Sequence, residues 1–348
     1  MLAEKLYVYS YLSYYEDMGN KKYQEYKEKA TSILEKVESL TSFVNPELLS
    51  NDFSLIEKYI SKNKKLEIYR RALENLFRFK DHILSEKEEK ILSDASEAFK
   101  TPTNAYDAID NVDIKFDKIK NENNEDVELT PYNYGGFLAS KNRDVRKSAF
   151  MSEYKFYKEH INTLSSLYIG NVKNNSFICN VRGYDSILDM HLYPDEISNK
   201  LYKTLISVTD DNIHYLKDFY KYKSKKLGYK MHMYDLYVNT SNMIDKKIKY
   251  EEAINIVNNA LEVLGSDYLS HFNEILNNRC VDVYPRKYKR SGAFEWGIYG
   301  ISPYVSLNYD ETINSVSTLA HEMGHAMHTY YSNKNQDYLY AGYPVVLA

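Results

Sequence analysis

One stretch near the end of the 348-residue chain combines the residue types that hold a metal ion. His321 and His325 lie four positions apart, and Glu322 lies between them. On an α-helix this spacing projects both imidazoles from one face, where they can bind one Zn²⁺. Glu322 points about 100° round the helix from His321, which suits acceptance of a proton from a metal-bound water. The sequence therefore predicts a zinc site with His321 and His325 as ligands and Glu322 as the catalytic base.

The residues around this motif favour a buried helix. Apolar residues recur at helical spacing through the motif, which predicts one side packed in a core: Val316, Leu319, Ala320, Met323 and Met327. Gly324 costs about 1 kcal/mol against Ala inside a helix, and we expect it to permit close approach of another backbone or of the metal site. The alternative is a helix that carries two solvated or core histidines and a chance motif, which predicts no stoichiometric zinc.

Composition narrows the class of protein. Lys and Arg (45) are interspersed with Asp and Glu (49), and the net charge is −4. No basic face argues for nucleic acid. Gly (12) and Pro (7) are scarce, so we expect a mainly helical protein.

The N-terminal sequence and the number of cysteines indicate the cellular compartment in which the protein is expected. The chain does not begin with a basic region followed by an apolar core, and no run approaches 18 apolar residues, so neither a signal peptide nor a membrane partner is expected. Cys179 and Cys280 are the two cysteines, far apart in sequence. Buried thiols in a reducing, cytoplasmic compartment are the expected state. The residues carry no signal for an oligomeric state.

Apolar periodicity divides the chain into two domains. Residues 1–110 predict an all-helical N-terminal domain, which includes a helix from a capping box at Ser85 to about Phe99 and a break at 101–104. Residues 111–348 predict a catalytic domain that opens with a small β-hairpin. Its first strand is expected at 112–116, where Val112, Ile114 and Phe116 alternate with polar residues, and its return strand at 127–129.

The second domain is expected to be helical before the motif. Helices are predicted over 144–180, over 197–227 with Gly228 as the stop, and over 250–264 and 266–277. The basic run at 286–290 is expected to be a solvated loop, and the glycines at 292–300 suggest a loop with close backbone approach. A strand is predicted at 304–309, immediately before the motif helix. Its free edge is expected to pair with an extended peptide; the alternative is that the strand only covers the helix.

Five segments together resemble oligoendopeptidase F, of the thimet-oligopeptidase-like zinc metallopeptidases. They are the motif stretch 318–328 and the segments 289–294, 303–309, 232–237 and 140–147. The resemblance covers essentially the whole chain and implies a mostly helical zincin-type fold with a deep channel. It also implies a cytoplasmic zinc endopeptidase that cleaves short peptides, with His321 and His325 on zinc and Glu322 as catalytic carboxylate.

The family pattern also differs from this chain in two ways. Family members begin well before the position of Met1, and their third zinc ligand is a Glu that would follow Ala348 directly. The chain is therefore expected to be partial at both ends. His328 lies three residues after His325, but three imidazoles from one short helix would struggle to surround an ion tetrahedrally, so a packing role is expected. The alternative function is a truncated, inactive fragment, or a helical peptide-binding protein that lacks a complete zinc site.

Overall fold

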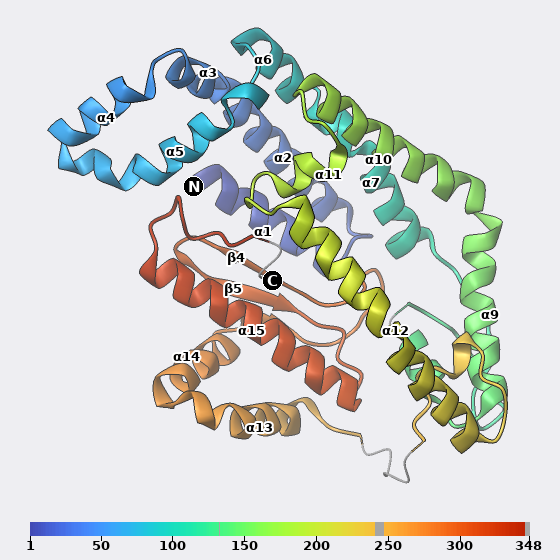
Figure 1. Cartoon of the computed structure of the whole chain (residues 1–348). Coiled ribbons are helices and arrows are strands. Elements are labelled where there is room, and N and C mark those ends of the chain that lie inside the picture. Colours follow the sequence, from blue (N-terminus) through green and yellow to red (C-terminus); the bar gives the residue numbers. More distant parts are fainter. Residues whose placement is uncertain (132, 241–246, 345–348) are drawn as a thin grey trace.

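The computed structural model describes residues 1–131, 133–240 and 247–344, and most of them lie in helices (Figure 1). The prediction of a mainly helical protein is confirmed. The N-terminal third is helical throughout, as its periodicity predicted. Its α-helices are α1 (Leu2–Glu16), α2 (Lys21–Thr41), α3 (Val44–Leu49), α4 (Phe53–Lys62), α5 (Arg70–Arg78), α6 (Glu86–Asp94) and α7 (Ser96–Ala108).

The predicted break at 101–104 is wrong, because α7 runs straight through Pro102. The capping box at Ser85 is present, with Glu88 as its partner, but the helix it opens ends at Asp94. Pro102 removes one backbone hydrogen bond from α7. Packing of α7 on α10 (Ile161–Val181) compensates, since Asn174 of α10 donates a hydrogen bond to the Phe99 carbonyl at 2.9 Å.

The predicted β-hairpin is present, but its first strand lies further along the chain. β1 (Ile119–Lys120) pairs antiparallel with β2 (Asp126–Val127), with Ile119 opposite Val127. Residues 109–113 instead form a π-helical turn that extends α7. Three alternating apolar residues are too few to separate a strand from a continuing helix. The hairpin packs on α9 (Arg143–Glu159), where Ile119, Leu129 and Ala149 form a small core.

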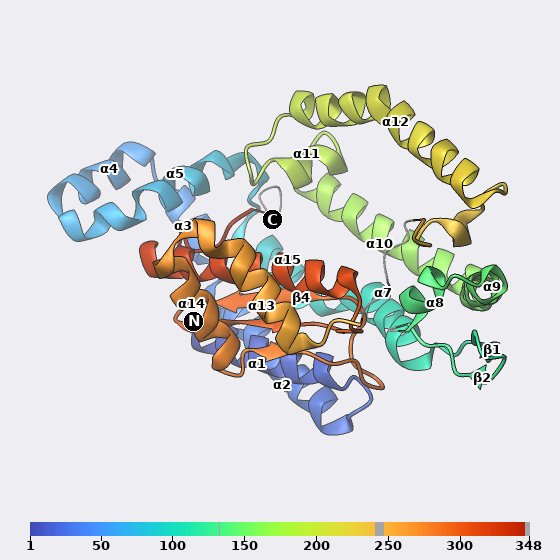
Figure 2. The same ribbon diagram turned by 90° about the horizontal axis from the view of Figure 1, so that it is seen from below.

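The middle of the chain ends in a long helix with few partners. α8 (Tyr134–Ala139), α9 and α10 lead through α11 (Ile187–Leu192) to α12 (Asn199–Leu227). Gly228 stops α12 as predicted, in the left-handed conformation with φ 75°. Figure 2 shows α12 crossing the molecule away from the sheet. Every residue from 201 to 219 is exposed, including Leu205 and Tyr215.

A buried ion pair joins two of the segments that carry the family resemblance. Arg146 of α9 and Asp235 are both fully buried, and a guanidinium nitrogen of Arg146 lies 2.8 Å from the Asp235 carboxylate. Arg143 and the His232 amide also donate to this carboxylate. Burial raises the pKa of Asp235, but these hydrogen bonds outweigh it and the net pKa is lowered. The two segments therefore hold α9 against the loop after α12.

Asp235→Asn is expected to destabilise the protein by about 3–5 kcal/mol, because it leaves the Arg146 charge buried and unpaired. Chemical denaturation measures the loss. Asp218→Asn is the matched control, because the Asp218 carboxylate makes an exposed ion pair with Lys221 and such pairs contribute about 0–1 kcal/mol. Equal stability of the two variants would contradict the assignment.

The C-terminal part builds a small sheet covered by helices. The helices are α13 (Tyr250–Leu261), α14 (Ser266–Asn277) and α15 (Ile313–Asn335). α14 matches its predicted range, whereas α13 ends at Leu261 and the rest of its predicted range, 262–264, is a 3-10 turn. β5 (Ile301–Ser306) is the central strand, with β3 (Val281–Asp282) parallel on one side and β4 (Phe294–Ile298) antiparallel on the other. The main core lies between α13, α14, the sheet and α15.

Two predictions about this sheet are wrong. The glycine-containing stretch at 292–300 is not wholly loop, because residues 294–298 form β4. The strand before the motif helix is β5, which pairs with β4 on one side and, at Val305 and Ser306, with β3 on the other, so it is the central strand and not an edge strand. In the described part of the chain the two edge strands, β3 and β4, have no further strand on their outer sides. Side chains alternate in character along 304–309, which is why the sequence predicts a strand there. In β4 no such alternation is recognised, because Gly297 interrupts the pattern.

The basic run at 286–290 is not a solvated loop. Lys289 is buried, and its ammonium donates to the carbonyl oxygens of Asp282, Tyr284 and Leu307. Arg286 makes a bidentate pair with Asp282 at 2.8 Å. These contacts tie the loop before β4 to the ends of β3 and β5. The run therefore has a structural role that its charge alone did not indicate.

Cys179 and Cys280 are both buried and free in the described residues, as predicted. Burial raises the pKa of the Cys280 thiol, which suits an inert packing group. Among the described residues, no helix combines the length and apolarity that a membrane crossing requires.

Candidate active site

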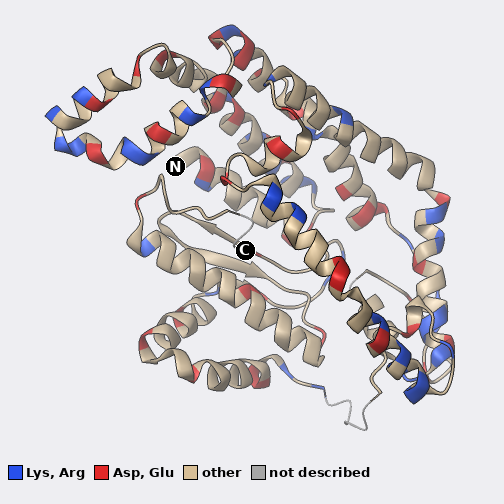
Figure 3. Cartoon of the chain, in the orientation of Figure 1, with Lys and Arg blue, Asp and Glu red and all other residues tan. Residues whose placement is uncertain are grey.

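The motif helix α15 is fixed at its start and along one side. Thr312 caps it, with its hydroxyl accepting from the Ser315 amide at 3.2 Å. The predicted apolar side is buried against the sheet and α13, with Leu319, Met323 and Met327 almost inaccessible. Glu322 and Lys334 are the charged residues of α15, and the helix and sheet are nearly free of charge in Figure 3. The site therefore lies on a rigid, apolar support.

The two motif histidines converge. The Nε2 atoms of His321 and His325 lie 3.1 Å apart, with their rings perpendicular. Two nitrogens bound to one tetrahedral zinc at roughly 2.0–2.1 Å would lie about 3.4 Å apart. His321 is exposed and His325 partly so, which leaves the nitrogens accessible. This geometry fits two ligands of a single zinc ion.

Glu322, between the two histidines in the sequence, is less accessible than they are. Its side chain is buried, and burial raises its pKa although His321, His325 and a hydrogen bond from the Glu295 amide act against that. A carboxylate beside two imidazoles, with a raised pKa, is suited to accept a proton.

A second carboxyl group, which the sequence gave no reason to select, lies beside Glu322. Burial, followed by the charge of Glu322, raises the pKa of Glu295 on β4 to about 7, and a hydrogen bond with Thr329 opposes this rise. Its Oε1 atom is buried and has no hydrogen-bond partner among the described residues. The residue lies between two apolar ring residues of β4, Phe294 and Trp296, and carries no motif of its own.

The third histidine does not join the pair. The His328 ring stacks on Tyr343, with centroids 3.8 Å apart and planes 10° apart. No cluster of three His, Cys, Asp or Glu residues suited to a metal ion occurs in residues 1–131, 133–240 and 247–344. The segment expected to precede a third ligand runs to Ala348, and its residues 345–348 lie outside the described residues. The described site thus has two candidate ligands.

Close approach was predicted for Gly324, but a Cβ there would meet nothing within 4 Å among the described residues. Close approach occurs instead at Gly297 of β4. A Cβ at Gly297 would lie 2.0 Å from the Thr329 methyl carbon and 2.8 Å from the Glu295 carboxylate. Glycine at this position therefore lets β4 lie directly against α15.

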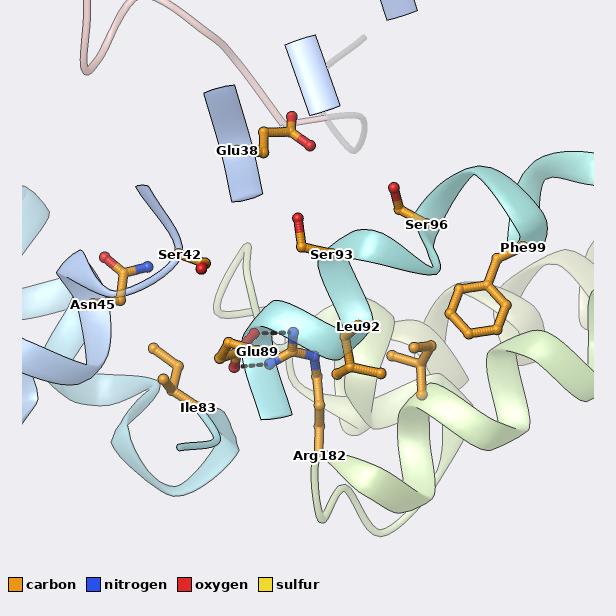
Figure 4. Close-up of a pocket in the computed structure, with 11 residues that line it drawn as sticks. Glu38, Ser42, Asn45, Ile83, Glu89, Leu92, Ser93, Ser96, Phe99 and Arg182 are labelled. Atoms are coloured by element: carbon orange, nitrogen blue, oxygen red, sulfur yellow. Dashed lines mark hydrogen bonds and ion pairs between the residues drawn. The ribbon is translucent and has the colours of Figure 1, made fainter. Parts of the chain in front are cut away.

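A cavity of about 400 Å³ lies away from the motif helix, between α2, α6, α7 and α10 (Figure 4). The bidentate pair of Arg182 with Glu89, at 2.9 Å, lines one side, and Glu38 lies on another. No residue of α15 lines this cavity. It offers no metal-ligand set and is separate from the candidate site.

Comparison with known proteins assigns the chain to a family. The pattern of Peptidase family M3 matches residues 137–348, which include the His321–His325 motif, and that of Oligopeptidase F matches residues 47–116. The chain belongs to Peptidase family M3, a family of metalloendopeptidases.

Individual relatives agree over the whole length of this chain. It is 35% identical over 345 residues to oligopeptidase PepF of Bacillus subtilis, covering 99% of this chain and 52% of the relative. It is 36% identical over 347 residues to an oligoendopeptidase F homolog of Lactococcus lactis, covering 99% and 58%. The crystal structure of oligoendopeptidase-F from Enterococcus faecium superposes with a TM-score of 0.73 at 28% identity, covering 95% and 55%. The chain thus spans about half the length of these relatives.

Proposed function

We propose that this chain carries the zinc-binding and proton-transfer groups of an endopeptidase that hydrolyses short peptides. The observation that supports it best is the pair of converging imidazoles with an adjacent buried carboxylate, on one helix of an M3 family member. The names of the relatives, oligopeptidase and oligoendopeptidase, are consistent with short peptides as substrates.

In this proposal each residue has one task. His321 and His325 hold the zinc ion through their Nε2 atoms. Zinc, when bound, polarises the scissile carbonyl and lowers the pKa of water. Glu322 accepts a proton from the attacking water on its carboxylate and passes it to the leaving amine. Its burial makes it a stronger base than an exposed glutamate, which favours the first of these transfers.

The extended peptide is proposed to pair with the outer edge of β4, since β5 is the central strand and β4 (5 residues) is a longer edge strand than β3 (2 residues). We also retain the division into an N-terminal helical domain, residues 1–110, and a catalytic domain, residues 111–348. Two buried free thiols support a reducing, cytoplasmic location.

Zinc content and hydrolysis of a short fluorogenic peptide, measured on one zinc-loaded sample after removal of excess metal, test the proposal. We expect one zinc per chain and cleavage that a chelator abolishes and added zinc restores. A sample that holds no stoichiometric zinc, or whose cleavage survives chelation, would contradict the proposal.

A further inference from the structure

A second, smaller cavity of about 270 Å³ lies between α1, α2 and α7. All its lining residues belong to these three helices, so it is separate from the candidate active site on α15. Each helix contributes side chains that are three or four positions apart and therefore share one face. These are Tyr11 and Tyr14 on α1, Lys27 and Thr31 on α2, and Glu97 and Lys100 on α7.

Lys27 is the charged group in this cavity that the fold leaves without a counter-ion. Its side chain is half-buried, and its ammonium lies 4.4 Å from the ring centroid of Tyr14 and 5.1 Å from that of Tyr11. It makes no ion pair with any described residue, whereas Lys100 pairs with Glu35 at 3.0 Å. A cation held over two rings is already ordered, so an entering carboxylate can form a charge-assisted hydrogen bond with Lys27 at little entropic cost.

Two carboxylates supply the opposite charge. Glu28 and Glu97 line the same cavity, are exposed, and make no ion pair within the part of the chain that the structure describes. They are more accessible than Lys27, so they suit an ammonium group near the mouth of the cavity, and Lys27 suits a carboxylate further in. A ligand with a single charge would meet one group of like sign. A zwitterion satisfies both.

Thr31 is a separate indication that a polar group belongs in this cavity. It is 6% exposed, and its hydroxyl has no hydrogen-bond partner among the described residues. Buried hydroxyls in native proteins are nearly always hydrogen-bonded, and an exception is often explained by a bound water, ion or ligand. The volume is just below the range of about 300–1,000 Å³ that holds drug-sized ligands, so it suits a single amino acid better than a longer peptide.

We propose that this cavity binds a free amino acid with an apolar side chain. Its carboxylate pairs with Lys27, its ammonium pairs with Glu28 and Glu97, and its side chain lies against the rings of Tyr11 and Tyr14. A free amino acid is the end product of peptide breakdown. A role for the cavity as a sensor of that product therefore rests on the proposed function, whereas the binding itself does not.

Tyr11 also provides a readout of binding. Its ring packs edge-to-face on Trp296 of β4, with centroids 6.0 Å apart, and Trp296 is the single tryptophan of the chain. Occupation of the cavity changes the contacts of Tyr11 and hence the environment of Trp296. Tryptophan fluorescence therefore reports binding without any need for zinc or turnover.

The test is titration of the full chain with L-leucine, followed by calorimetry and by Trp296 fluorescence. We expect one saturable site per chain with a Kd of about 1 mM or lower, unaffected by a chelator. L-leucinamide lacks the carboxylate and N-acetyl-L-leucine lacks the ammonium, so each should bind at least about 10-fold more weakly. Binding that a chelator abolishes would place the amino acid at the candidate active site and would overturn the inference.

Lys27→Met removes the ammonium and keeps an apolar side chain. We expect its affinity for L-leucine to fall at least about 10-fold and its preference for L-leucine over L-leucinamide to vanish, which a general loss of structure would not produce. Lys22→Met is the matched control with wild-type binding, because Lys22 is an exposed residue of α2 that lies over Tyr26, outside the cavity.

Three results would each contradict the proposal: no saturable binding of L-leucine up to about 10 mM, equal affinity of the wild-type chain for L-leucine and L-leucinamide, or a wild-type preference in Lys27→Met. If the zinc-loaded chain shows no zinc-dependent hydrolysis, the proposed function fails, and the binding data decide by themselves whether the cavity takes an amino acid.

Discussion

Glu322→Gln is expected to lower kcat for peptide hydrolysis by about 10²–10⁴-fold while zinc binding is retained. The carboxamide has nearly the same size, but it cannot accept a proton at neutral pH. Because Glu322 is buried and is not one of the two proposed zinc ligands, its charge is the property that the substitution removes. Rates of fluorogenic peptide cleavage and zinc content, measured on the same sample, test this prediction.

Glu295→Gln provides the matched control for Glu322→Gln. It neutralises a neighbouring carboxyl group, whose pKa burial raises to about 7, but one to which the proposed mechanism gives no role. A large loss in Glu322→Gln and a small one in Glu295→Gln would separate the base from its neighbour. Equal losses would mean that the combined charge of the two carboxyl groups matters, and wild-type turnover in Glu322→Gln would exclude Glu322 as the base.

The parts of the fold that sequence periodicity predicted are those with long, regular patterns. The helices of the first third, α13, α14 and the stop of α12 at Gly228 all follow from apolar spacing and caps. Pro102 is the informative failure. A proline in a surface helix is a sound reason to end it, but the side-chain hydrogen bond from Asn174 and packing on α10 are tertiary contacts that no local pattern contains.

The residues of the candidate site also fall into two groups, those that the sequence predicts and those that only the tertiary structure brings together. The spacing of His321, Glu322 and His325 on one helix lets the sequence alone place them together. In the structure the imidazoles of His321 and His325 converge. Glu295 comes from a different element, and only the pairing of β4 with β5 and the packing of β4 on α15 bring it to Glu322. Gly297 was the available signal, since a glycine inside a strand often marks close backbone approach.

Several residues in the segments that carry the resemblance support the framework without entering the site. Arg146 with Asp235, and Lys289 with three carbonyl oxygens, are buried charges satisfied by specific partners. Such groups are intolerant of change because loss of a partner leaves the other charge unpaired in the interior. Their full sets of specific partners distinguish them from a catalytic charge, whereas burial does not, since the proposed base Glu322 is buried as well.

His325→Ala is expected to lower zinc affinity by more than about 100-fold, and His321→Ala by a similar amount. Changes to groups that merely support a zinc ligand cost about 10–100-fold, so removal of one of two converging imidazoles should cost more. His328→Ala is the matched control, because His328 lies on the same helix but stacks on Tyr343, and we expect its zinc affinity to stay within about threefold of wild type. Competition with a chromophoric chelator measures all three. A loss in His328→Ala as large as in His325→Ala would show that the metal takes ligands across three residues of one helix, and the two-histidine assignment would then be wrong.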